Sequence, residues 1–290
     1  MSTPLNPHGE NPNTYIVHDS SNREEMARLH LQDQLLTMSM GGALVEQPDP
    51  SSLHSILDIG CETGSWLINV AKTYPNIPIL AGVDINGKTL DYARKQAAAE
   101  GVGDRVQFYV MDALGVLEFP THSFDLVNQR YGMGFVRTWE WPDLMEQYRR
   151  VTRPGGVVRI TEGEVVLESS STALKQLNEL LLQAMCNAGH FFECQNDGVI
   201  SHLTQLLHQS SYQNIQTHPH TFIYRAETKE GRDFYEIMRL AYRTASPFLR
   251  KWIRLPDTYD ALYQQALKEM QRPDFTATWK LLTVWANTPK

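Results

Sequence analysis

Short apolar segments alternate with helical segments over the first half of this chain, and no other feature of the sequence constrains the fold as strongly. The apolar segments lie at residues 55–60, 79–84, 106–111, 124–129 and 157–161. Segments of helical periodicity lie between them, at residues 65–75, 87–101 and 144–151. Parallel strands need crossover connections of this kind. The pattern therefore predicts a doubly wound α/β fold with a mostly parallel sheet.

The second half of the chain is less regular and predicts a cap over this sheet. Helical patterns occupy residues 172–188, 199–210, 231–245 and 258–271. Alternating patterns typical of strands occupy residues 215–226 and 276–288. We expect insertions at about 166–210 and 226–272 to cap the sheet, and the two strands to join it.

The N-terminal region has two parts. Residues 1–14 are polar and predict a loose arm, and an amphipathic helix is expected from Ser20 onward. We therefore expect an arm and lid helix at 1–50, an α/β core at 51–165, and the cap with the final strands at 166–290.

Composition narrows the class of protein. At 290 residues the chain has the length of one or two domains, and 42% hydrophobic residues supply a full-sized core. A formal net charge of -7 gives no positive field for nucleic acid, so no nucleic-acid partner is expected. A homo-oligomer is compatible with this composition.

Cysteine usage and the first residues predict a location in the cytoplasm. Three cysteines cannot form a disulfide framework, and the odd number leaves one unpaired, which favours a reducing compartment. The start of the chain lacks the basic and apolar parts of a signal peptide. No stretch approaches the roughly 20 apolar residues that span a bilayer.

Polar residues follow three of the predicted strands. In an open parallel sheet, ligands bind beyond the carboxyl ends of the strands, and the first turn commonly holds an anion or nucleotide. This turn contains Gly60, which permits close approach of a ligand, and Gly64, which lets the next helix pack near the strand. Asp84 ends the second strand and Asp112 follows the third, where carboxylates can accept hydrogen bonds from ribose hydroxyls and an exocyclic amine.

Four motifs, in order LDIGCETG, GVDIN, VMDA and RPGG, resemble those of class I S-adenosylmethionine-dependent methyltransferases. The resemblance covers roughly residues 50 to 165 and implies a seven-stranded sheet whose last strand is antiparallel. It also implies S-adenosyl-L-methionine as the cofactor. The residues that it assigns to cofactor binding are Asp58, Gly60, Cys61, Gly64, Asp84, Ile85, Asp112, Ala113 and Asn128.

The resemblance implies a role for each part of this set. Gly60 and its neighbours line the methionine part of the cofactor, and Asn128 lies near it. Asp84 holds the ribose, whereas Asp112 and Ala113 hold the adenine. One position departs from the family pattern, because Glu62 stands where a glycine is usual.

Other interpretations of these residues exist. Each aspartate alone could be a helix N-cap, although three successive strand ends are not explained by capping. A nicotinamide-dependent oxidoreductase would need glycines at the positions of Glu62 and Ser65. A protein or RNA methyltransferase and a non-catalytic partner subunit with the same fold are further alternatives.

Two groups of histidine and cysteine residues have close spacing in the sequence. Cys186, His190 and Cys194 are spaced by four residues, but Gly189 interrupts the helix and buried thiols are common, so no metal is expected. The pair His218 and His220 flanks a proline on an edge strand and predicts surface histidines.

The acceptor is expected to be a small, hydrophobic metabolite. Aromatic residues are plentiful in the predicted cap, and some of them should wall an apolar pocket. Methyl transfer by in-line displacement needs no covalent intermediate, and a general base is required only for some acceptors. By chain region alone the base could be His190, Glu162, Glu164 or Tyr131, with no preference among them, and the catalytic residue stays unknown.

Overall fold

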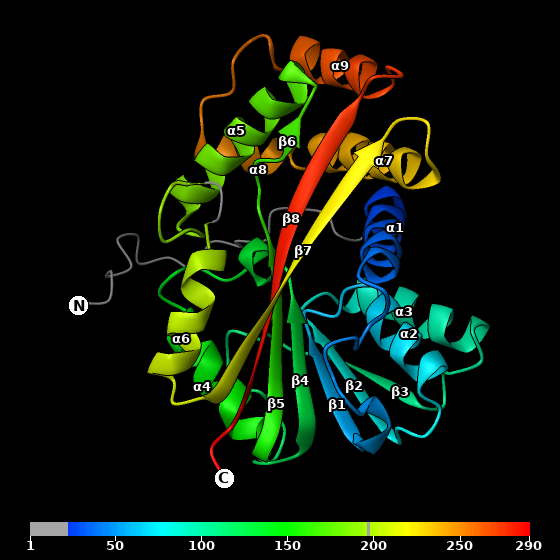
Figure 1. The fold of residues 1–290 in the computed structure, drawn as a ribbon, viewed down its shortest axis with the longest axis vertical. Helices are drawn as coiled ribbons and strands as arrows, with labels where there is room; N and C mark the ends of the chain where they lie inside the picture. The colour runs from blue at the N-terminus through cyan, green and yellow to red at the C-terminus, as the bar shows by residue number, and fades with distance from the viewer. Residues whose placement is uncertain (1–22, 196–197) are drawn as a thin grey trace.

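A single mixed sheet organises the computed structural model, which describes residues 23–195 and 198–290 (Figure 1). The strands of the core are β1 (Ser55–Ile59), β2 (Ile79–Asp84), β3 (Val106–Val110), β4 (Phe124–Arg130) and β5 (Thr152–Gly163). The strands that follow are β6 (Glu168–Ser169), β7 (Gln213–Arg225) and β8 (Thr276–Asn287). The order β3-β2-β1-β4-β5-β8 is extended by β7, which pairs along β8, and by the short β6 at the start of β8.

Strands β1 to β5 are parallel, and β8 is antiparallel to β5, β6 and β7. The predicted doubly wound fold with an antiparallel last strand is confirmed. The sheet has eight strands where seven were expected, because the two-residue β6 adds a short pairing.

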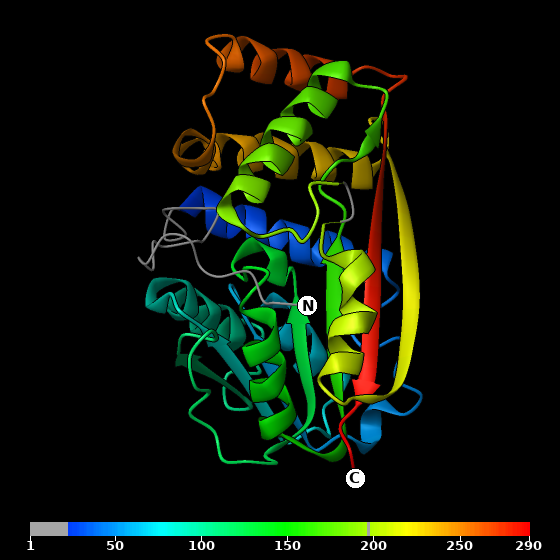
Figure 2. The same ribbon diagram turned by 90° about the vertical axis from the view of Figure 1, so that its left-hand side faces the viewer.

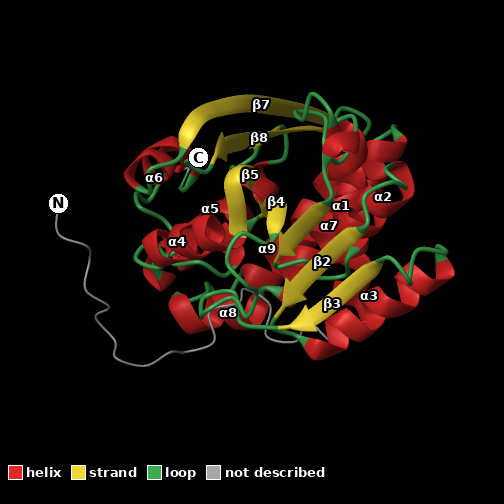
Figure 3. Ribbon diagram, turned by 90° about the horizontal axis from the view of Figure 1, so that it is seen from below, coloured by secondary structure: helices red, strands yellow, loops and turns green. Residues whose placement is uncertain are grey.

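Helices cover both faces of the core sheet. These helices are α2 (Ser65–Thr73), α3 (Gly87–Ala99), α4 (Trp141–Val151) and α6 (Leu203–Gln209), and α1 (Arg23–Ser39) packs against α2. Alternate strand residues face opposite ways, so Ile56 and Leu126 pack with α2 and α3, whereas Leu57 and Val127 pack with α4. Figure 3 shows α2 and α3 on one side of the strands and α4 with α6 on the other.

The remaining helices form a layer beyond the carboxyl ends of the parallel strands. This cap consists of α5 (Thr172–Ala188), α7 (Lys229–Thr244), α8 (Ser246–Trp252) and α9 (Tyr259–Met270). Figure 2 shows α1 between the cap and the core, and α1 packs against both α7 and α2. The helix expected from Ser20 is described from Arg23, and the arm expected at 1–14 lies outside the described residues.

The cysteines differ from expectation. Cys186 and Cys194 form a disulfide, and Cys61 is a buried free thiol. The pairing was missed because Gly189, in the left-handed conformation, ends α5 and lets the chain turn back toward it. Within the described ranges, no helix is both long and apolar enough to cross a membrane.

Gly64 gives the first testable prediction. It begins α2 with φ of 69°, and an added Cβ would lie 2.6 Å from Phe108 Cζ. We expect Gly64→Ala to lower the free energy of unfolding by about 3 kcal/mol, from left-handed strain and the clash together.

Gly101→Ala is the matched control for this prediction. Gly101 also has positive φ, but its added Cβ would meet nothing within 4 Å, so only the strain of about 1 kcal/mol remains. Urea denaturation of both variants measures the difference, and equal costs would contradict the clash.

Candidate functional site

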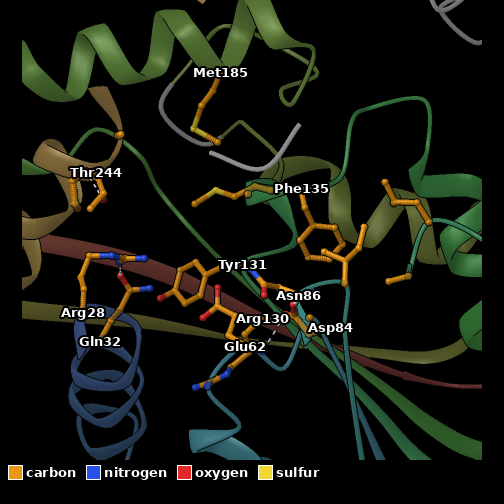
Figure 4. Close-up of a pocket in the computed structure, with 18 of the residues that line it drawn as sticks. Arg28, Gln32, Glu62, Asp84, Asn86, Arg130, Tyr131, Phe135, Met185 and Thr244 are labelled. Carbon is orange, nitrogen blue, oxygen red and sulfur yellow. Dashed lines mark hydrogen bonds between the residues drawn. The ribbon is translucent and has the colours of Figure 1, made fainter. Parts of the chain in front are cut away.

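A cavity of about 1420 Å³ opens at the carboxyl ends of the parallel strands, beneath the cap. Its floor comes from the turns that follow β1, β2, β3 and β4, and its roof from α1, α5, α7 and the segment between β5 and β6. Figure 4 shows side chains from these elements converging on one space. Five of the residues predicted for cofactor binding line this cavity, namely Gly60, Asp84, Ile85, Asp112 and Ala113.

The turn after β1 is held in an unusual backbone conformation. Gly60 has φ of 63°, and a Cβ there would lie 3.1 Å from Phe135 Cε1. Glu62 has φ of 49°, so this glutamate takes a conformation that glycine adopts more easily. The turn thus keeps its conformation although glutamate replaces the usual glycine at position 62, at a backbone strain of order 1 kcal/mol or more. The replacement also adds a carboxylate to the cavity wall.

The Asp84 carboxylate joins two turns. Its Oδ2 accepts from the Glu62 N–H at 3.1 Å, and its Oδ1 accepts from the Asn86 N–H at 2.8 Å. Burial raises the pKa of Asp84, whereas these two N–H donors act in the opposite direction. Asp84 thus shapes the first turn as well as lining the cavity.

The turn after β3 forms one end of the cavity. Asp112 Oδ1 accepts from the Leu114 N–H at 3.0 Å, which fixes the turn and leaves its other oxygen available for further contacts. The neighbouring Ile85 and Val110 are 63% and 59% exposed although both are apolar. Exposed apolar side chains can pack against the face of a flat ring, and a neighbouring carboxylate can accept a hydrogen bond from an amine on that ring.

Four residues of the predicted cofactor set lie outside this cavity. Asp58 and Cys61 border a small adjoining pocket, whereas Gly64 and Asn128 line neither space. Asn128 is fully buried and donates its amide N–H to Asp58 Oδ1 at 2.7 Å. The Asn128 side chain lies within the sheet, between Asp58 and Arg159, so its placement beside the methionine part stays a prediction.

The possible general bases separate into two pairs. Tyr131 and Glu164 line the cavity, whereas Glu162 and His190 are fully buried and do not. Glu162 accepts from Gln129 Nε2 at 3.2 Å and from the Met133 N–H at 3.3 Å, and burial raises its pKa to about 8. Glu162 therefore holds the loop after β4 instead of facing a substrate.

His190 also has a structural position. The carbonyl oxygen of Val136 can only accept, so His190 Nδ1 donates to it at 3.1 Å. The two cysteines considered with His190 as metal ligands are joined to each other, so neither offers a thiolate. No cluster of three His, Cys, Asp or Glu residues suited to a metal occurs in the part of the chain that the structure describes.

The prediction for the His218 and His220 pair is partly wrong. Their rings stack at 4.5 Å, but only His218 is exposed, and His220 is 7% exposed. Its Nε2 lies 3.0 Å from Thr283 Oγ1 and 3.7 Å from Glu46. The segment that follows α1 covers this part of the sheet, which a strand pattern alone does not reveal.

Several residues that line the cavity belong to none of the sequence motifs. Arg28 and Gln32 on α1 are joined at 2.6 Å and face the cavity (Figure 4). Arg130 at the end of β4 pairs with Asp33 of α1. In the roof, Tyr242 donates a hydrogen bond to Asn178. The rest of the roof is mainly apolar, with Val165, Leu167, Leu181, Met185, Met238, Ala241 and Ala245.

Comparison with known sequences shows that the core of the chain is similar to methyltransferases. A family described as methyltransferase domain matches residues 56–156. Methyltransferase GfsG from Streptomyces halstedii is 32% identical over 122 residues, which cover 41% of this chain and 41% of that protein. Aklanonic acid methyltransferase DauC from Streptomyces sp. (strain C5) is 32% identical over 125 residues, 42% of this chain and 54% of that protein. The similarity thus spans about half the length of these relatives or less.

A solved structure extends the similarity of fold to most of the chain. The YcgJ protein from Bacillus subtilis matches with a TM-score of 0.56 at 16% identity, over 87% of this chain and 99% of that chain. At this identity the likeness concerns the fold alone.

The hydrogen bond in the roof gives the second prediction. Tyr242→Phe leaves the buried Asn178 Oδ1 without its donor, and we expect it to lower the free energy of unfolding by about 2 kcal/mol. The double variant Tyr242→Phe/Asn178→Leu removes both partners and should be more stable than the Tyr242→Phe variant. Guanidinium denaturation measures both, and a double variant that is less stable than the single one would contradict this account.

Proposed function

The chain contains a class I S-adenosylmethionine-dependent methyltransferase domain, matched over residues 56–156, and from this premise we propose that it methylates a small, hydrophobic metabolite. The observation that carries the proposal is the convergence of three strand ends on one cavity. Gly60, Asp84 and Asp112 come from the turns after β1, β2 and β3 and line the same space.

The floor of the cavity suits the cofactor. In the proposed arrangement Asp84 accepts from the ribose hydroxyls, and Ile85, Asp112 and Ala113 border the adenine. The amino-acid end of the cofactor then lies between the turn at Gly60 and helix α1. Arg28 on α1 borders this end of the cavity and is itself paired with the buried carboxylate of Glu25 at 2.7 Å.

The size and lining of the cavity support a hydrophobic acceptor. Single-ligand pockets commonly have volumes of about 300–1,000 Å³, and this cavity of about 1420 Å³ can take a cofactor and an acceptor together. Its roof offers mainly apolar side chains and the amide of Asn178. The relative DauC is named for aklanonic acid, a small molecule, which agrees with an acceptor of this class.

The residues of the chain would promote transfer mainly by positioning. S-adenosylmethionine supplies, when bound, an electrophilic methyl group on a sulfonium. The floor holds the donor and the apolar roof holds the acceptor in line with it. A hydroxyl or carbon-acid acceptor must lose a proton, and we assign the role of general base to Glu164. Glu164 lines the cavity next to the apolar side chains of Val165 and Leu167.

The third prediction concerns cofactor binding. We expect Asp84→Ala to weaken the binding of S-adenosylhomocysteine by about tenfold or more, because a buried acceptor of two hydroxyls is lost. Isothermal titration calorimetry measures the dissociation constant. The control is Asp104→Ala, an exposed carboxylate that does not line the cavity, which should stay within about twofold. No binding of S-adenosylhomocysteine by the unaltered protein would reject the proposed function.

The fourth prediction concerns the acceptor. The protein is incubated with S-adenosylmethionine that carries a labelled methyl group and with a cell extract divided into an organic-soluble and a peptide fraction. We expect label to enter compounds of the organic-soluble fraction, and the Asp84→Ala variant to transfer much less. Label in the peptide fraction alone would favour a protein methyltransferase, and cofactor binding without any transfer would favour a non-catalytic subunit.

A further inference from the structure

A chain of buried polar side chains crosses the sheet beneath the cofactor turn. Asn128 donates to Asp58 Oδ1 at 2.7 Å, and Arg159 Nη1 donates to Asn128 Oδ1 at 2.8 Å. Arg159 in turn forms two hydrogen bonds with the Glu46 carboxylate, both at 3.1 Å. The Asp58, Asn128 and Arg159 side chains are at most 4% exposed, and none of the four residues lines the large cavity. Burial of four polar groups in one row is costly unless each is paired.

The strand register forces this row. Asp58 pairs with Asn128 across β1 and β4, and Asn128 pairs with Arg159 across β4 and β5. Residues paired directly across neighbouring strands project from the same face of a sheet. The three side chains therefore must meet on the face that α2 covers, at the level just before the Gly60 turn.

The donors and acceptors in the row permit one orientation. Arg159 has only N–H donors, so Asn128 must present its oxygen to Arg159 and its NH₂ group to Asp58. The Glu46 carboxylate only accepts and thereby fixes the guanidinium. Burial opposes ionisation of Glu46, but the adjacent Arg159 outweighs it and lowers the pKa of Glu46. The amide of Asn128 is thus oriented by a charge pair that lies farther from the cavity.

Glu46 connects this row with helix α1. The segment between α1 and β1 lies against the sheet, where Ala43 and Leu44 are buried and Trp66 Nε1 donates to the Ala43 carbonyl at 3.2 Å. The same α1 brings Arg28 and Gln32 to the cavity. One continuous segment therefore reaches the cofactor space from the α1 side and reaches the underside of the cofactor turn through Glu46.

We propose that Glu46, Arg159 and Asn128 are positioning residues that hold the Asp58 carboxylate, and with it the Gly60 turn, in the conformation that binds the cofactor. This inference rests on the proposed function, since it concerns the same cofactor turn. Asp58 lies between the row and the turn, bordering the small pocket that Gly60 and Glu62 also border. Burial raises the pKa of Asp58, and the Asn128 hydrogen bond and the Arg159 charge limit the rise to about 7, so the row favours the carboxylate form.

The first test removes the charge pair while keeping the fold. Replacing a buried ion pair by apolar side chains of similar size commonly preserves stability. Because Glu46→Leu/Arg159→Met also leaves the buried Asn128 Oδ1 without a donor, we expect a folded protein that unfolds at a lower denaturant concentration than the unaltered protein. Calorimetry should nevertheless show S-adenosylhomocysteine binding weakened by about tenfold. The control Glu168→Leu/Lys280→Met removes an exposed ion pair from β6 and β8 and should bind within about twofold. Equal affinities of the two double variants would overturn the proposal.

The second test exchanges the partners of one hydrogen bond. Asn128→Asp removes the N–H that Asp58 accepts and should weaken S-adenosylhomocysteine binding. Asp58→Asn/Asn128→Asp restores a donor facing an acceptor but removes the carboxylate at position 58, so it should recover the stability that Asn128→Asp loses without recovering its affinity. Unchanged affinity of the folded Asn128→Asp variant would contradict the positioning role. Absence of binding by the unaltered protein would instead reject the proposed function itself.

Discussion

The parallel pairing of β1 with both β2 and β4 is the constraint on which the rest of the structure depends. It places the ends of these strands at one edge of the sheet, so residues that are 24 or more positions apart in sequence, such as Gly60 and Asp84, share one cavity. The carboxylate of Asp84 then ties the first turn to the second by accepting from two backbone N–H groups. The site is therefore a consequence of strand register, and no long connecting loop has to be ordered to form it.

The same strand register also aligns a row of buried polar side chains beneath the site. Asp58, Asn128 and Arg159 are brought into one row because they are direct cross-strand partners, and their burial demands that each be hydrogen-bonded. The carboxylate of Glu46, from the segment after α1, completes the row by pairing with Arg159. The helix that closes one side of the cavity is in this way chemically linked to the turn at its floor.

The cap and the core contribute side chains of different character to the cavity. The floor offers carboxylates, backbone N–H groups and exposed apolar residues such as Ile85, which suit a nucleoside. The roof offers methionine, leucine and alanine side chains from α5 and α7, together with the polar pair Asn178 and Tyr242. Methionine adapts its shape more readily than branched residues, so a roof of this kind suits a bulky acceptor without a fixed outline.

Local patterns predicted the core of the fold and the floor of the site, because strand ends and glycine turns are encoded in short stretches. The burial of the Asn128 side chain against Arg159 was not predicted, since this hydrogen bond joins residues 31 positions apart. Arg28, Asn178 and Tyr242 were missed because they reach the cavity only through packing of α1, α5 and α7 against the core. The burial of His220 and the disulfide of Cys186 and Cys194 likewise depend on how distant segments cover or approach them.

A crystal structure of the protein with S-adenosylhomocysteine tests the central claim most directly. The account predicts the ribose hydroxyls within hydrogen-bond distance of Asp84, the adenine against Ile85 and Asp112, and the amino-acid end between the Gly60 turn and α1. A ligand bound outside this cavity, or bound in it with the adenine beneath α5 and α7, would contradict the account.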